Sequence, residues 1–211
     1  MSKHRLEAFS DGVFAVAITI LALDLKVPAT SDLAHHHGLW SAVRYDWPTF
    51  AAYLTSFFVI GIIWISHNGV FRHIAVIDRG LLFFNLVLLL FVVAIPFTTS
   101  LVAAYLNERH AGHVAVALYS AVMFGHAAAW TGLWWWASRH PALLAAHVDP
   151  SLARAALPRF ALGTPVYLLA IGLSFVNAKL TLLFHLVVAI IYSFEQLRLE
   201  RPVSLDAPRE T

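Results

Sequence analysis

Long apolar runs, separated by short polar segments, make up most of this chain and leave few folds open to it. The first run extends from Gly12 to Leu23, and five more cover roughly residues 47–70, 80–105, 112–137, 160–176 and 179–197. The chain is 60% hydrophobic and only 12% charged, whereas soluble domains carry about 25% charged residues. The sequence therefore predicts an all-α integral membrane protein with six transmembrane helices, which form one domain over residues 1–197.

The distribution of basic residues predicts how these helices are oriented. Six crossings place both termini on one side of the membrane, and most of the 14 Lys and Arg residues then fall on that side. The opposite side receives only Lys26, Arg44, Arg109 and Lys179. By the positive-inside rule, both termini are expected in the cytoplasm. Residues 198–211 are polar and contain prolines, so we expect a short, disordered cytoplasmic tail.

Composition and motifs disfavour several classes of function. The chain has no cysteine, which excludes disulfides, thiol catalysis and thiolate metal sites. Its basic residues are dispersed, unlike those of a nucleic-acid-binding surface. Neither a nucleophile–base constellation nor a metalloprotease motif is present, so an enzyme and a bound cofactor are not expected. The histidine run 35–37 has a metal-binding residue type, but a flexible external loop gives it no rigid frame, and we predict no metal site.

The first apolar run is too short for a helix that faces lipid. It lies between Asp11 and Asp24 and spans about 18 Å as a helix, whereas a lipid-facing span needs roughly 20 apolar residues. A helix buried among others, or one lining a water-filled path, does not have to match the lipid thickness. Ionisable residues at membrane depth face protein or water. We therefore expect Asp11 to meet neighbouring helices and Asp24 to lie at the external mouth of a path, where it attracts cations.

Helical periodicity divides the first helix into two faces. Phe9, Val16, Thr19, Ile20 and Leu23 form one longitudinal stripe. Ser10 and Asp11 lie on the opposite side and need partners elsewhere, and Arg5, which falls on the stripe, cannot reach Asp11 within the helix. From periodicity alone, a stripe of this kind is more typical of packing or lipid contact than of a pore.

The second and third helices offer partners for the polar side of the first. Trp64, His67 and Asn68 share one face near the cytoplasmic end of the second helix, and Asn85 opens the third at the same depth. The predicted polar network comprises Arg5, Phe9, Ser10, Asp11, Trp64, His67, Asn68 and Asn85. Such a network also serves simply to hold helices together. His126 and His185, isolated in apolar runs, are predicted to be hydrogen-bonded packing residues.

The first-helix pattern R-x-x-x-F-S-D-G-V-F-A-V-A-I-T-I-L-A-L-D-L resembles the signature of bacterial members of the transmembrane protein 175 potassium-channel family. Its hallmark is Arg5 followed by Phe9-Ser10-Asp11, and the likeness continues through Trp64, His67 and Asn68 and through residues 85–101. The resemblance implies a homotetramer in the bacterial inner membrane, with the first helix of each subunit lining a central pore. In the family, bulky apolar side chains make the narrowing, and the matching positions here are Val16, Ile20 and Leu23. The family also uses a threonine three residues after the first layer, which corresponds to Thr19.

The resemblance further implies passive, weakly potassium-selective conduction through a hydrophobic constriction. No T-V-G-Y-G loop is present to supply carbonyl cages. The family often has isoleucine or leucine where this chain has Val16.

Two other interpretations stay open from the residues alone. One is a secondary transporter or proton-coupled carrier that uses Asp11 and His67, and the other is a membrane enzyme or haem protein that uses His67, His126 and His185.

Overall fold

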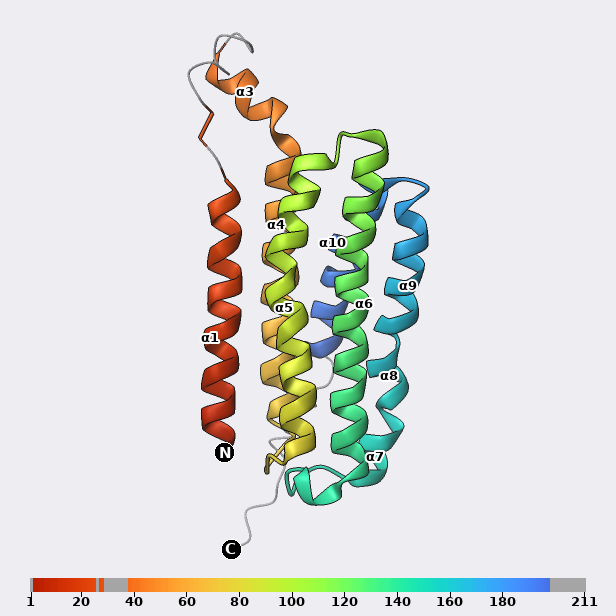
Figure 1. The fold of residues 1–211 in the computed structure, drawn as a ribbon. Coiled ribbons are helices and arrows are strands. Elements are labelled where there is room, and N and C mark those ends of the chain that lie inside the picture. The colour runs from red at the N-terminus through yellow and green to blue at the C-terminus, as the bar shows by residue number, and fades with distance from the viewer. Residues whose placement is uncertain (1, 26, 29–37, 198–211) are drawn as a thin grey trace, which may run out of the picture.

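The computed structural model describes residues 2–25, 27–28 and 38–197, so the predicted tail and the histidine run 35–37 lie outside the described residues. The described part is helical, and its only β-type pairing is the isolated bridge between Ile74 and Leu144. The major helices run side by side as an elongated bundle (Figure 1). The helices that form it are α1 (Lys3–Leu21), α4 (Trp47–Phe71), α5 (Arg79–Tyr105), α6 (Arg109–Arg139), α9 (Gly163–Ser174) and α10 (Ala178–Leu197).

Shorter helical segments connect these helices. The 3-10 turn η1 (Ala22–Asp24) continues α1, and α3 (Leu39–Tyr45) leads into α4 at the upper end of the bundle in Figure 1. At the opposite end, η2 (Pro141–Leu143) and α7 (Pro150–Ala155) follow α6, and α8 (Leu157–Ala161) then leads into α9. Because α1 begins and α10 ends at the same end of the bundle, the chain enters and leaves it on one side (Figure 1).

The helix predicted over 160–176 is instead the end of α8 followed by α9, and α7 and α8 extend this helical region back to Pro150. Proline fixes φ and lacks an N–H, so it favours the first turn of a helix. Pro150, Pro158 and Pro165 each lie in the first turn of α7, α8 or α9. Asp149 caps α7 by accepting hydrogen bonds from the Ser151 hydroxyl and N–H, and these bonds lower the pKa of its carboxyl.

Four described segments are long and apolar enough to cross a membrane, and the chain is a multi-pass membrane protein. They are Trp47–Phe71, Arg79–Tyr105, Arg109–Arg139 and the three-part segment Pro150–Ser174. α10 contains a shorter apolar stretch, Ala178–Tyr192, and α1 carries charged residues in its first turns. For α1 and α10, crossing the membrane therefore stays a prediction.

The bundle buries its side chains around α5 and α6. α5 packs against α6 and α4, α6 also packs against α9, and α1 lies against α4 and α5. α1 thus contacts the rest of the protomer along one side only, as the separated red helix in Figure 1 illustrates.

Candidate pore-lining helix and its polar network

One face of α1 is buried against its own protomer. Leu6, Ser10, Phe14, Ala17 and Leu21 are all buried, and their spacing of three or four residues keeps them on one side of a helix. Ser10 is the polar member of this face. The face is otherwise apolar, which suits packing against α4 and α5.

The other face of α1 is largely exposed in the described protomer. Val16, Ile20 and Leu23 are 56%, 42% and 78% exposed, and Phe9 is also exposed. The Thr19 hydroxyl lies on this side and donates to the Val16 carbonyl oxygen at 2.9 Å. The predicted stripe is therefore presented to the surroundings of the protomer: lipid, another subunit or a pore.

A chain of hydrogen bonds joins the buried face of α1 to α4 and α5. The Asn85 amide donates from Nδ2 to the Ser10 hydroxyl at 3.1 Å. Its Oδ1 accepts from Nε2 of His67 at 2.9 Å. All three side chains are buried, so these bonds fix three helices at one level. A buried polar group that lost its partner here would be costly.

A separate hydrogen bond joins α1 directly to α4, next to this chain of bonds. Trp64 donates from Nε1 to Oδ1 of Asp11 at 2.8 Å. Asn68 donates from Nδ2 to the Trp64 carbonyl oxygen of its own helix at 3.2 Å. The structure therefore gives Asp11 and His67 different partners, and a direct proton transfer between them has no bond to follow.

The remaining members of the predicted network lie apart from these bonds. Arg5 is exposed, and Phe9 lies on the exposed face of α1. Asp24 ends the turn η1, and its side chain lies outside the described residues. Its predicted place at a pore mouth stays a prediction.

Aromatic rings hold the His67 side chain, a feature that sequence reasoning missed. The His67 ring stacks on Phe71 at a centroid distance of 4.3 Å, and Phe14 approaches it edge-on at 5.4 Å. Phe71 lies four residues after His67 and so stacks on it within α4, a spacing that the sequence offered as a signal. The contact from Phe14 depends on how α1 crosses α4, which periodicity does not reveal.

Further polar contacts between helices lie deeper in the bundle. His126 and His185 were predicted as hydrogen-bonded packing residues, and a bond is seen for His185 but not for Nε2 of His126. The serine, threonine and tyrosine partners were missed. Ser56 of α4 shares a hydrogen bond of 2.7 Å with Thr99 of α5, and it donates to the Tyr119 hydroxyl at 3.2 Å. His185 of α10 bonds to Ser120 of α6 at 2.8 Å through Nε2. His126 stacks on Trp130 with a centroid distance of 6.2 Å. Isolated Ser, Thr and His residues in apolar runs were the available signal, since such groups need partners in a membrane.

The described residues contain no group of three or more His, Asp or Glu side chains arranged to hold a metal. What the site does offer is a helix held firmly on one side and open on the other. That arrangement suits an element placed at an interface or beside a conduit.

Comparisons with known proteins place the chain in a family. The model for the family described as endosomal/lysosomal potassium channel TMEM175 matches residues 5–96. A curated potassium channel from Streptomyces collinus is 50% identical over 91% of this chain and 92% of its own length. The chain belongs to the TMEM175 family. The family resemblance predicted from the first helix is thus confirmed, and the TMEM175 family consists of channels rather than enzymes.

Solved structures and animal members extend the comparison. The crystal structure of a potassium-selective TMEM175 homolog from Chamaesiphon minutus matches with a TM-score of 0.82 and 34% identity, over 92% of this chain and 97% of that one. The human endosomal/lysosomal proton channel TMEM175 is 34% identical over 51% of this chain, which corresponds to 22% of the human protein. The bacterial relatives thus match along nearly their whole length, and the human protein over one part.

Proposed function

We propose that the chain is one subunit of a homotetrameric potassium channel in which α1 from each subunit lines the pore. The observation that carries the proposal is the face of α1 that bears apolar side chains and stays largely exposed in the described protomer. Membership of a family whose bacterial members are named potassium channels supports it. Four copies of that face, placed around an axis, make a narrow apolar conduit.

Val16, Ile20 and Leu23 form successive layers of the proposed constriction. The four residues from Val16 to Ile20 place the first two layers about 6 Å apart along α1. Leu23 follows in the 3-10 turn η1, where the rise per residue is about 2 Å. A hydrophobic constriction closes to ions by dewetting and conducts when it widens enough to stay wet. Potassium holds its water shell less strongly than sodium, so an apolar neck favours it weakly. Flow is passive, and no cofactor takes part.

Thr19 is the polar group between the first two layers. Its hydrogen is donated to the Val16 carbonyl oxygen, which leaves the hydroxyl oxygen as an acceptor facing the conduit. A cation that has lost part of its water can interact with that oxygen. Asp24, at the end of the same helix, attracts cations to the external mouth.

The hydrogen-bond network sets which face of α1 points at the axis. Ser10 and Asp11 bond to α5 and α4 respectively, and a helix fixed at two points on one side cannot rotate freely. Rotation by one residue would turn Val16 away from the axis. The network thus acts as a structural support for the constriction.

The proposed placement is the bacterial inner membrane, with both termini in the cytoplasm. The start of α1 and the end of α10 lie at the same end of the bundle (Figure 1), as six crossings require. In this arrangement α7, α8 and α9 together make the fifth crossing, while α1 is shielded from lipid by its neighbours in the tetramer.

Ion flux into proteoliposomes tests the proposal. Purified wild-type protein under a potassium gradient is compared with Val16→Ala and Ile20→Ala, each measured with potassium and with sodium. We expect passive flux that prefers potassium, and a loss of preference in both variants because the neck widens. Val93→Ala is the matched control, since Val93 is similarly exposed but lies on α5. Flux that responds equally to all three substitutions would move the conduit away from α1.

Proton passage is a second candidate, because the matching human protein is named a proton channel. The same vesicles, loaded with a pH-sensitive dye, report proton entry when potassium is absent. A proton flux that changes in the Val16→Ala variant would indicate that protons and potassium ions pass through the same constriction. Saturable flux in which proton and potassium movements are coupled would instead favour the carrier that uses Asp11 and His67.

A further inference from the structure

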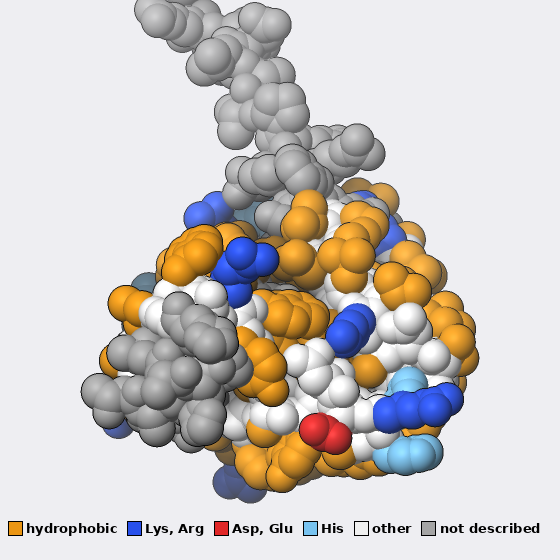
Figure 2. Space-filling model, turned by 90° about the horizontal axis from the view of Figure 1, so that it is seen from above, with side chains coloured by type: hydrophobic (Ala, Val, Ile, Leu, Met, Phe, Trp, Pro, Cys, Tyr) orange, Lys and Arg blue, Asp and Glu red, His pale blue; other side chains and the backbone are white. Residues whose placement is uncertain are grey.

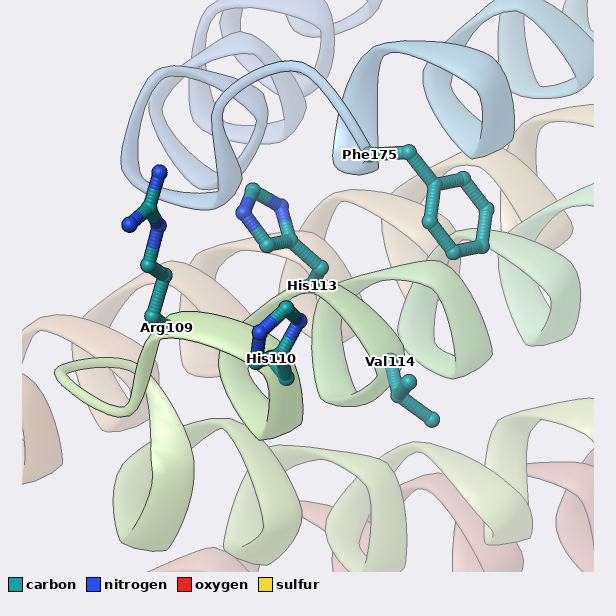
Figure 3. A pocket seen from close by; sticks show the side chains of 5 residues that line it. All are labelled: Arg109, His110, His113, Val114 and Phe175. Carbon is teal, nitrogen blue, oxygen red and sulfur yellow. The ribbon is translucent and has the colours of Figure 1, made fainter.

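A basic pocket lies at the end of the bundle opposite the chain termini. It encloses about 390 Å³ and is lined by Arg109, His110, His113, Val114 and Phe175. Figure 3 shows Arg109, His110 and His113 on the first turns of α6, on the side of the connection between α9 and α10. The proposed conduction path does not use these residues, because none of them lies on α1.

The pocket concentrates positive charge and hydrogen-bond donors. Arg109 and His110 are exposed, and they occupy the first two positions of α6, where helix N–H groups and the helix dipole also favour an anion. Within the described part of the chain, no carboxylate forms an ion pair with Arg109. Figure 2, which looks onto this end, shows basic and histidine side chains together at the rim.

His113 gives the pocket a fixed wall. Its Nδ1 donates to the Ser174 carbonyl oxygen at the end of α9, and Ser120, two turns along α6, bonds to the Ser174 hydroxyl at 3.3 Å. α6 and α9 are therefore held together close to Arg109 and His110. Glu108, the acidic neighbour, precedes α6 and makes no side-chain cap.

Apolar side chains continue from the pocket toward the middle of the bundle. Val114 and Leu118 are exposed at successive turns of α6, and Phe175 is exposed beside them. Guanidinium and imidazole groups above an exposed apolar strip match a molecule with an anionic head and a hydrocarbon tail. A free inorganic anion would make no contact with this apolar strip.

We propose that this pocket binds the phosphate group of a membrane phospholipid, with an acyl chain along Val114 and Leu118. Arg109 holds the phosphate through its planar, forked donors, and His110 donates a further hydrogen bond. Such a lipid ties the α6 end of the protomer to the surrounding leaflet.

Native mass spectrometry of the purified full chain in detergent tests the proposal, with phosphatidylglycerol as the probe. We expect Arg109→Gln/His110→Gln to weaken phosphatidylglycerol binding roughly tenfold, since a charged hydrogen bond contributes about 1.5 kcal/mol. This variant avoids His113, whose loss would disturb the contact between α6 and α9. Arg44→Gln is the control, because Arg44 is an exposed arginine at the same end of the bundle.

Each other result overturns the assignment. Equal loss in Arg44→Gln would show general attraction of an anionic lipid to a basic surface. Undiminished binding in the double variant would remove the lipid from this pocket. Equal binding of diacylglycerol with the same chains would exclude phosphate recognition. Displacement of phosphatidylglycerol by inorganic phosphate at similar concentration would assign the pocket to a free anion.

Discussion

Two contacts in this protein join helices by different means. The α5–α6 seam consists of glycines on α6 that face phenylalanines on α5: Gly125 lies against Phe91, and Gly132 lies against Phe84. The α1 anchor consists of the hydrogen bonds that Ser10 and Asp11 make to Asn85 and Trp64. The first contact depends on close fit, and the second depends on a few directional bonds.

The difference matters because lipid is as apolar as a helix surface. Apolar burial therefore does little to drive helices together in a membrane, and small residues that allow close approach do more. The α5–α6 seam uses this device along its length, which makes it the rigid core of the protomer. The α1 anchor holds α1 at two points on one side while its far face stays exposed, which is the arrangement that the proposed pore lining needs.

The largest expected effect comes from filling the α5–α6 seam with Gly125→Ala/Gly132→Ala. A Cβ at Gly125 would lie 2.2 Å from Cε1 of Phe91, and one at Gly132 would lie 2.5 Å from Cε1 of Phe84. Overpacking of this kind costs about 1–3 kcal/mol per site, and the better helix propensity of alanine offsets up to about 1 kcal/mol of that cost. Equilibrium unfolding in detergent, followed by circular dichroism, should show a clear loss of stability.

Gly61→Ala is the matched control for the seam. A Cβ there meets nothing within 4 Å, and alanine in place of a mid-helix glycine stabilises by up to about 1 kcal/mol. Equal stability of the seam variant and wild type would show that α5 and α6 separate easily, and the comparison between the two contacts would fail.

A smaller effect is expected from Asn85→Leu, which removes the centre of the α1 anchor. Ser10 and His67 would each lose a buried partner, at a cost of about 1–2 kcal/mol for interhelical hydrogen bonds in a membrane. Hydrogen exchange, read helix by helix, should show faster exchange in α1 while α5 and α6 keep their protection.

Thr98→Val is the control for Asn85→Leu. Thr98 is buried in the same helix, but its hydroxyl bonds to the Ile95 carbonyl oxygen within α5. It should leave the exchange of α1 unchanged. Faster exchange spread evenly over all helices in Asn85→Leu would mean that α1 and the seam unfold as one unit.

The sequence predicted most helices well but not all of their ends. The predicted run 47–70 became Trp47–Phe71, and 80–105 became Arg79–Tyr105, whereas 112–137 lengthened to Arg109–Arg139. Apolarity marks the part of a helix that suits lipid, and a helix continues into water wherever its backbone bonds allow. The breaks between α7, α8 and α9 occur just before Pro158 and Pro165. The tendency of proline to start a new helix there competes with the continuous apolar pattern.

The faces of α1 were predictable because periodicity is a local property. Ser10 and Val16 lie on opposite sides of any helix with this spacing. Equal depth in the membrane predicted that Ser10 and Asn85 belong to one polar group, but not that they bond to each other. The contact of Phe14 with His67 and the packing of the seam glycines depend on how two helices cross. The spacing of residues in a single sequence does not reveal that crossing.

The smallest expected effect on stability comes from the bond between Trp64 and Asp11. Trp64 is 42% exposed, so water or lipid headgroups compensate in part for the lost bond, and Trp64→Phe should cost less than about 1 kcal/mol. Asp11→Ala removes the same hydrogen bond by deleting its acceptor. The double variant should therefore lose no more free energy of unfolding than either single variant. Size-exclusion chromatography should show less of the proposed tetramer in each variant, while the proposed potassium preference of the tetramers that form stays unchanged. Normal assembly with altered selectivity would place Asp11 in the conduction path, and the α1 anchor would then be part of the pore and not only its support.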